Sequence, residues 1–173
     1  MAARNPAYAE LNGMTSISKA DPNIRKWDLR FLNLARHIAE WSKDPSRKIG
    51  AVITRPDRRI VSQGYNGFAI GVEDSPERYA DKMTKYEMVV HAEVNAIITA
   101  GKDLTGTTLY STLMPCSRCA AVIINSGIKK VVTIVDDVTV LKFDNTAHSF
   151  ELSTKQFEEA GVKVVTYNLS ELS

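Results

Sequence analysis

The chain contains only two cysteines, and their spacing suggests metal chemistry. Cys116 and Cys119 follow Pro115, which is well placed to occupy the first position of a helix, so both sulfurs would lie in its opening turn and face the same way. The positive end of that helix favours thiolates over thiols. Two thiolates on one face provide half of a tetrahedral zinc site. The alternatives are a redox-active pair and two inert buried cysteines.

A histidine and a glutamate lie two positions apart in the mostly apolar run VVHAEVNAII. His91 can supply a third zinc ligand, although a histidine in such a run is more commonly a packed core residue. Three protein ligands leave the fourth zinc position for water, whose pKa zinc lowers toward neutrality, and Glu93 fits as the accompanying base and acid. Residues two apart in a regular helix point to opposite sides, so both must lie at the irregular start of their helix.

The two stretches together form one pattern. His-x-Glu followed by Pro-Cys-x-x-Cys is the established signature of zinc-dependent nucleobase deaminases. Every member of that signature is present here, and one predicted strand separates the two halves and can bring the two helix starts together. The sequence therefore predicts a zinc site formed by His91, Cys116 and Cys119, with Glu93 as the proton carrier of a hydrolytic deamination.

The hydrophobic pattern predicts the elements that position these residues. After an Asp21-Pro22 cap, apolar residues recur at helical spacing and predict a core-facing helix, at Ile24, Trp27, Phe31, Leu34, Ala35, Ile38 and Trp41. Runs rich in β-branched residues predict five strands, at 49–54, 59–64, 107–113, 130–135 and 162–168. Helices are expected near 92–101, 115–126 and 153–160, ending at Gly101, Gly127 and Gly161. A hairpin followed by alternating helices and strands predicts a mixed five-stranded sheet of the α/β class.

Size and charge limit the remaining possibilities. The chain has 173 residues, 44% of them hydrophobic, which suits one globular domain over 21–173 preceded by an amino-terminal arm over 1–20. A net charge of +2 produces no strong field toward nucleic acid or membrane. No apolar run approaches the roughly 20 residues that span a bilayer, and the first twenty residues make a poor signal peptide. We therefore expect a cytoplasmic protein without a membrane partner.

The chain resembles the deoxycytidylate (dCMP) deaminases over about half its length. The similar segments are SRKIGAVI (46–53), GYNGF (64–68), TKYEMVVHAEVNAI (84–97) and TLYSTLMPCSRCAAVIINSGIKKVV (108–132). The resemblance implies a three-layer α/β/α sandwich, Zn²⁺ as cofactor, and hydrolysis of dCMP to dUMP and ammonia. It also implies a homo-oligomer, often a hexamer.

Several residues are expected to bind the nucleotide. By resemblance, Asn66 contacts the sugar and base, although Asn-Gly is also a common hairpin turn. A monophosphate needs an anion site, and Ser46, Arg47 and Lys48 lie just before a strand, where side chains and amides can reach a phosphate. Basic residues at such a position are also commonly just solvated.

The base itself needs a second set of contacts. Backbone groups near Ala92 and Leu113, beside the metal ligands, are expected to recognise its edge. Tyr110 can stack on the ring or belong to the core.

Other substrates stay open at this point. Residues 136–161 match the family weakly and follow the last shared strand, where such folds complete the pocket, so a 5-substituted dCMP or another small nucleotide or base is an alternative. A tRNA or single-stranded DNA deaminase needs a basic channel. Arg55, Arg58 and Arg59 lie instead in a hairpin turn of a nearly neutral protein, so nucleic acid is not the expected substrate. A catalytically silent zinc scaffold would have no use for Glu93.

Overall fold

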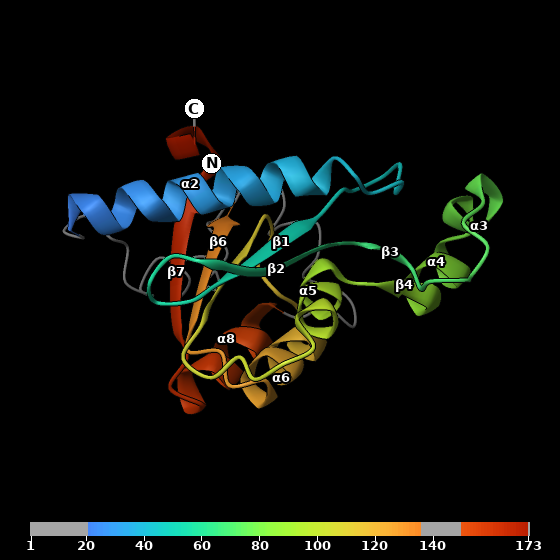
Figure 1. Ribbon diagram of the computed structural model, residues 1–173. Helices are drawn as coiled ribbons and strands as arrows, with labels where there is room; N and C mark the ends of the chain where they lie inside the picture. The colour runs from blue at the N-terminus through green and yellow to red at the C-terminus, as the bar shows by residue number, and fades with distance from the viewer. Residues whose placement is uncertain (1–20, 136–149, 173) are drawn as a thin grey trace, which may run out of the picture.

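A five-stranded mixed sheet forms the centre of the protein, as predicted. The computed structural model describes residues 21–135 and 150–172 (Figure 1), so the predicted amino-terminal arm lies outside the described residues. The strand order is β2-β1-β5-β6-β7. Their bounds are β1 Gly50–Thr54, β2 Ile60–Tyr65, β5 Thr108–Ser111, β6 Lys130–Val135 and β7 Lys163–Asn168. The pairs β1–β2 and β1–β5 are antiparallel, whereas β5–β6 and β6–β7 are parallel.

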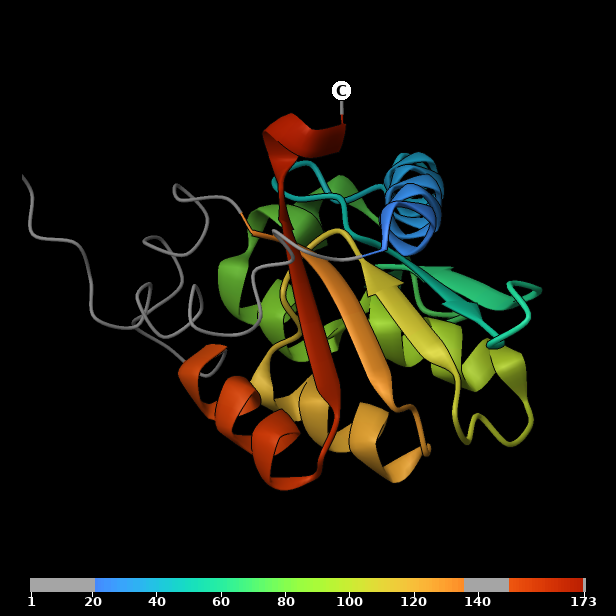
Figure 2. The same cartoon turned by 90° about the vertical axis from the view of Figure 1, so that its left-hand side faces the viewer.

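Helices cover both faces of the sheet and confirm the three-layer sandwich. Figures 1 and 2 show α2 on one face and α5, α6 and α8 on the other. The bounds are α2 Pro22–Ala39, α5 Ala92–Ala100, α6 Ser117–Asn125, α8 Phe150–Glu159 and the short 3-10 helix η1 Leu169–Leu172. Because side chains alternate along a strand, Val52 and Val132 pack toward α2, while Leu109 and Val131 pack toward the opposite helices. Within the described ranges, no helix has the length and apolar character to span a bilayer.

Helix α2 follows the predicted start, but its buried face differs from the predicted stripe. The Asp21 side chain accepts a hydrogen bond from the Asn23 amide at 2.8 Å, which caps the helix. Phe31, Ala35 and Ile38 are buried as expected. Ile24 and Trp41 are 46% and 50% exposed, Trp41 because α2 ends at Ala39.

Asp28 lies on the buried face of α2, which the apolar pattern does not reveal. Its carboxylate accepts hydrogen bonds from Lys130 Nζ at 2.9 Å and from the hydroxyls of Tyr110 and Tyr167 at 3.0 and 3.3 Å. These four side chains satisfy one another between α2 and the sheet.

Residues 67–90 form a segment that the sequence pattern did not predict. It comprises β3 Gly67–Phe68, α3 Pro76–Ala80, α4 Lys82–Met88 and β4 Val89–Val90, and it projects from the side of the sandwich (Figure 1). Antiparallel pairing of β3 with β4 returns the chain to the body just before His91. The ring centroids of Phe68 and Tyr79 lie 4.7 Å apart, and this contact holds α3 against the paired strands β3 and β4.

A close approach of β2 to α5 fixes the position of the helix that carries Glu93. A Cβ atom on Gly64 would lie 2.5 Å from the carbonyl oxygen of Ala92 and still closer to the amide of Ala96. Both are backbone atoms, which cannot rotate away. We expect Gly64→Ala to lower the free energy of unfolding by about 3 kcal/mol, measured by urea denaturation.

Gly67→Ala is the matched control for this substitution. A Cβ atom there would approach only the Tyr79 hydroxyl, at 3.9 Å, so we expect a change of about 1 kcal/mol or less. Equal unfolding free energies for the two variants would contradict the close approach of α5 to β2.

Candidate active site

The three predicted metal ligands meet where α5 and α6 begin. His91 is the residue before α5, with an extended backbone at φ −71° and ψ 153°. Cys116 precedes α6 in a similar conformation, and Cys119 is the third residue of that helix. Helix α6 therefore begins at Ser117 and not at Pro115, so the prediction that both cysteines lie inside the first turn is wrong for Cys116.

The spacing of the donor atoms suits a tetrahedral zinc ion. His91 Nδ1 lies 3.2 Å from Cys119 Sγ and 3.6 Å from Cys116 Sγ, and all three ligand atoms lie within 4.8 Å of one another. Zinc bonds of about 2.0 Å to nitrogen and 2.3 Å to sulfur at a tetrahedral angle place such atoms about 3.5 Å apart. His91, Cys116 and Cys119 are thus positioned to bind zinc.

The donor atoms act on one another's protonation, because they are buried close together. The hydrogen bond with Cys116 raises the pKa of His91. The same sulfur, together with burial, raises the pKa of the Cys119 thiol. A thiolate at Cys119 therefore needs a compensating positive charge, which a zinc ion provides.

Glu93 lies beside the ligands without belonging to their cluster. It is the second residue of α5 and only 4% exposed. Ser111 Oγ donates a hydrogen bond to Glu93 Oε1 at 3.3 Å, and Oε2 lies 3.8 Å from Cys119 Sγ. Burial raises the pKa of Glu93 above that of an exposed carboxyl group. As predicted, His91 and Glu93 lie at a helix start, where His91 has left the helical conformation.

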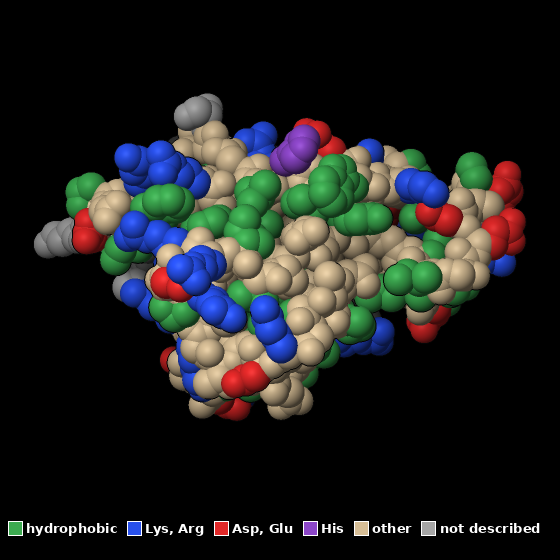
Figure 3. Space-filling model, viewed as in Figure 1, with side chains coloured by type: hydrophobic (Ala, Val, Ile, Leu, Met, Phe, Trp, Pro, Cys, Tyr) green, Lys and Arg blue, Asp and Glu red, His purple; other side chains and the backbone are tan. Residues whose placement is uncertain are grey.

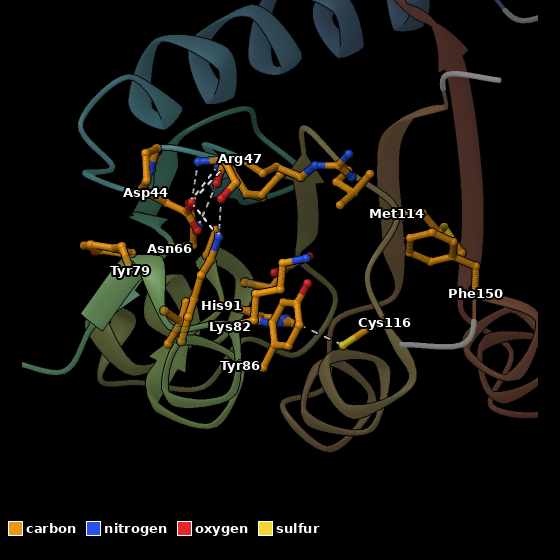
Figure 4. A pocket seen from close by; sticks show the side chains of 18 of the residues that line it. Asp44, Arg47, Asn66, Tyr79, Lys82, Tyr86, His91, Met114, Cys116 and Phe150 are labelled. Atoms are coloured by element: carbon orange, nitrogen blue, oxygen red, sulfur yellow. Dashed lines mark hydrogen bonds and ion pairs between the residues drawn. The ribbon is translucent and has the colours of Figure 1, made fainter. Parts of the chain in front are cut away.

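A cavity of about 540 Å³ opens beside this cluster (Figure 4). Four of the predicted substrate residues line it together with the metal-site residues His91, Glu93 and Cys116; they are Ser46, Asn66, Ala92 and Leu113. The volume falls in the usual range of small-molecule sites, about 300–1,000 Å³.

Asn66 organises the loop that borders this cavity. Its Oδ1 accepts a hydrogen bond from the Ile49 amide at 2.7 Å, and its Nδ2 donates to the Arg47 carbonyl at 3.0 Å and to Asp44 Oδ2 at 3.3 Å. Neither Asn66 nor Gly67 has a positive φ, so the alternative of a two-residue hairpin turn is wrong. The side chain holds residues 44–49 in place at the cavity wall.

Two predicted substrate contacts lie elsewhere. Tyr110 packs on the α2 side of the sheet, 5.0 Å from the Phe31 ring, with its hydroxyl on Asp28. Strand alternation explains this position, because its neighbour Ser111 faces Glu93 and Tyr110 must face the opposite way. Lys48 is absent from the cavity lining and donates to the Glu40 carbonyl at 3.3 Å. We therefore correct both expectations: Tyr110 is a core residue and Lys48 a surface residue.

Several residues of the cavity wall could not be recognised from the sequence. Asp44, Lys82, Lys85 and Tyr86 line it from the loop after α2 and from α4, and Phe150 lines it at the start of α8. Phe150 falls within the weakly matching segment, of which residues 136–149 lie outside the described residues. The family segment TKYE contained the signal for Lys85 and Tyr86, but nothing in it showed which side chains turn inward.

Comparisons with known proteins agree with this site. The family model for the cytidine and deoxycytidylate deaminase zinc-binding region matches residues 25–135. A protein of Aliivibrio fischeri, described as an uncharacterized deaminase in the luxG 3' region, is 42% identical over 141 residues, which cover 82% of this chain and 93% of that protein. The deoxycytidylate deaminase of Mus musculus is 39% identical over 130 residues, which cover 71% of this chain and 73% of that protein.

A solved structure supports the fold. The dCMP deaminase of cyanophage S-TIM5, crystallised with dCMP and dUMP, superposes with a TM-score of 0.61 at 22% identity, covering 86% of this chain and 99% of that chain. The family match includes both halves of the zinc signature and extends over more than half of the chain. This chain is a member of the cytidine and deoxycytidylate deaminase family.

Proposed function

We propose that this protein hydrolyses dCMP to dUMP and ammonia. The observation that carries the proposal is the cavity that joins a three-ligand metal site and a buried glutamate to a wall with basic side chains. A relative with 39% identity that is named a deoxycytidylate deaminase supports the same substrate.

Glu93 is the proposed catalytic residue. His91, Cys116 and Cys119 would hold the zinc ion, which would supply a Lewis acid that lowers the pKa of the water needed for attack at C4 of the cytosine. The Glu93 carboxylate takes a proton from the attacking water and delivers it to ring N3. It then passes a proton to the amino group, which leaves as ammonia. Ser111 keeps the carboxylate in place through its hydrogen bond to Oε1. Water adds and ammonia leaves, so that the reaction needs no other reactant.

Basic side chains are proposed to bind the 5'-phosphate. Arg47 and Lys82 both line the cavity, and Ser46 contributes a hydroxyl to the same wall. Guanidinium and ammonium groups form charge-assisted hydrogen bonds with phosphate oxygens. Asn66 is proposed to support phosphate binding indirectly, because it holds the loop of residues 44–49 in place, in addition to any contact with the sugar.

The positions of other basic residues support a small nucleotide over a nucleic acid. Lys and Arg side chains gather near the start of α2 and the β1–β2 hairpin (Figure 3). Arg30 and Arg58 stack on the Trp27 ring there, at 4.7 and 4.9 Å, and neither lines the cavity. A polynucleotide substrate would need such charges beside the metal site.

A homo-oligomer is part of the proposal. Hydrophobic side chains gather along α2 on the face shown in Figure 3. Trp41 and Tyr65 are exposed, with their rings 6.2 Å apart, and exposed apolar surface of this kind suits contact with further copies.

A substrate comparison tests the proposed function. Purified zinc-loaded protein is assayed for ammonia release from dCMP, deoxycytidine, 5-methyl-dCMP, dCTP and a cytosine-containing oligonucleotide. We expect the highest kcat/KM for dCMP, and a value at least about a hundredfold lower for deoxycytidine, because the nucleoside lacks the charge-assisted phosphate contacts. Equal values for dCMP and deoxycytidine would contradict the phosphate site, and a preference for the oligonucleotide would contradict the small-nucleotide assignment.

A further inference from the structure

A buried ion pair lies in the wall of the cavity, away from the metal ligands. Lys85 Nζ lies 2.7 Å from Asp44 Oδ1, and the two side chains are only 10% and 3% exposed. Lys85 comes from α4, in the projecting segment, and Asp44 comes from the loop after α2. Lys85 also donates to Ser46 Oγ at 2.8 Å.

Asp44 is charged and held by several donors. The backbone amides of Ser46 and Arg47 donate to its Oδ1 at 2.8 and 3.1 Å, and Asn66 Nδ2 donates to Oδ2. Burial by itself would raise the pKa of Asp44, but the hydrogen bonds from Lys85 and the two amides outweigh it and lower the pKa. Figure 4 shows Asp44, Arg47 and Asn66 joined by these interactions on the same side of the pocket.

This arrangement places a carboxylate in the wall proposed to receive a phosphate. The cavity is lined by the cationic side chains of Arg47, Lys82 and Lys85 and by the carboxyl groups of Asp44 and Glu93. Charges in a partly enclosed site are screened less than charges on an open surface. An uncompensated Asp44 would therefore repel a dianionic phosphate while scarcely affecting an uncharged nucleoside.

We propose that Lys85 is a specificity-determining residue that permits monophosphate substrates by neutralising Asp44, rather than by binding the phosphate itself. The inference rests on the proposed function, since it concerns the phosphate of the same substrate. Asp44 is needed to shape the loop that contains Ser46 and Arg47, and Lys85 removes the electrostatic penalty of that carboxylate. The pair also joins α4 to the loop, so the wall is fixed before a nucleotide enters.

The experiment compares kcat/KM for dCMP and deoxycytidine in four variants and the wild type. Lys85→Met removes the ammonium but retains the length of the side chain. Asp44→Asn removes the charge but keeps an oxygen that accepts from the two amides. The double variant removes both charges. Lys130→Met is the matched control, because it removes the partner of another buried aspartate, Asp28, on the opposite face of the sheet.

The expected readout is the ratio of the two specificity constants. Lys85→Met should lower the preference for dCMP by about tenfold or more. Asp44→Asn should preserve or increase it, and the double variant should return to within about threefold of the wild type. Lys130→Met should lower thermal stability and leave the ratio unchanged. A merely structural role of Lys85 would lower activity on both substrates equally.

Each other outcome contradicts the inference in a recognisable way. A double variant as unselective as Lys85→Met would mean that Lys85 binds the phosphate directly. Loss of a buried partner can prevent folding. If Lys85→Met does not fold, Asp44→Asn and the double variant test the inference. A fall in the ratio of kcat/KM for dCMP to kcat/KM for deoxycytidine in either variant overturns it. A wild-type protein without preference for dCMP would instead contradict the proposed function itself.

Discussion

Replacement of Glu93 by glutamine is expected to lower kcat for dCMP by about a thousandfold or more and to leave one zinc ion per chain. The amide keeps the size of the side chain and an oxygen for the hydrogen bond from Ser111, which now reaches Oε1 at 3.3 Å. It cannot take up and deliver a proton, and positioned acid–base groups typically contribute about 10²–10⁴-fold. Zinc should stay because Glu93 lies outside the ligand cluster. Steady-state kinetics and elemental analysis of the same preparation measure both quantities.

Ser111→Ala provides the graded control for this prediction. It leaves the carboxylate in place but removes its buried hydrogen-bond donor, so we expect a loss of about tenfold in kcat with unchanged zinc content. A Glu93→Gln enzyme within tenfold of the wild type would refute the catalytic role. Loss of zinc from that variant would instead indicate that Glu93 is a ligand.

Cys119→Ser is expected to abolish zinc retention and measurable activity and to lower the thermal midpoint of unfolding. Cys119 is buried in the first turn of α6, and its sulfur lies 3.2 Å from the imidazole at the start of α5, so a bound metal would join the two helices. A serine hydroxyl is a much poorer zinc ligand than a thiolate. An ion that binds only the folded state stabilises that state in proportion to its affinity. Zinc content after dialysis and thermal denaturation with and without a chelator measure the effect.

Ser117→Ala is the matched control, because Ser117 lies between the two cysteines at the first position of α6 and is not a ligand. It should keep zinc, activity and a chelator-sensitive melting curve. If Cys119→Ser retained stoichiometric zinc after dialysis, the assigned ligand set would be wrong.

The framework of the fold could be predicted from the sequence because its signals are local. Continuous runs rich in valine and isoleucine reflect strands that are buried on both faces, and the apolar spacing of α2 reflects a helix that is buried on one face, so the sheet and its covering helices follow from the pattern. The zinc ligands could be predicted for another reason. The chemistry requires His91, Cys116 and Cys119 at fixed spacings, and that requirement is visible without coordinates.

The cavity wall could not be predicted because its partners are distant in the sequence. Lys85 is buried with its ammonium group paired to Asp44, which lies 41 positions away. Residues 67–90 form short helices with little apolar periodicity, so their arrangement depends on the β3–β4 pairing. The choice between the two expectations for Tyr110 follows from strand alternation: because Ser111 faces Glu93, Tyr110 lies on the other face of β5, in the core.

X-ray absorption at the zinc edge tests the central claim most directly. The purified wild-type protein should contain one zinc per chain, with two sulfur neighbours at about 2.3 Å and lighter nitrogen or oxygen neighbours at about 2.0 Å. Such a spectrum would agree with His91, Cys116 and Cys119 holding the ion and one position remaining for water. A protein without stoichiometric zinc, or a zinc ion surrounded only by nitrogen and oxygen, would contradict the account.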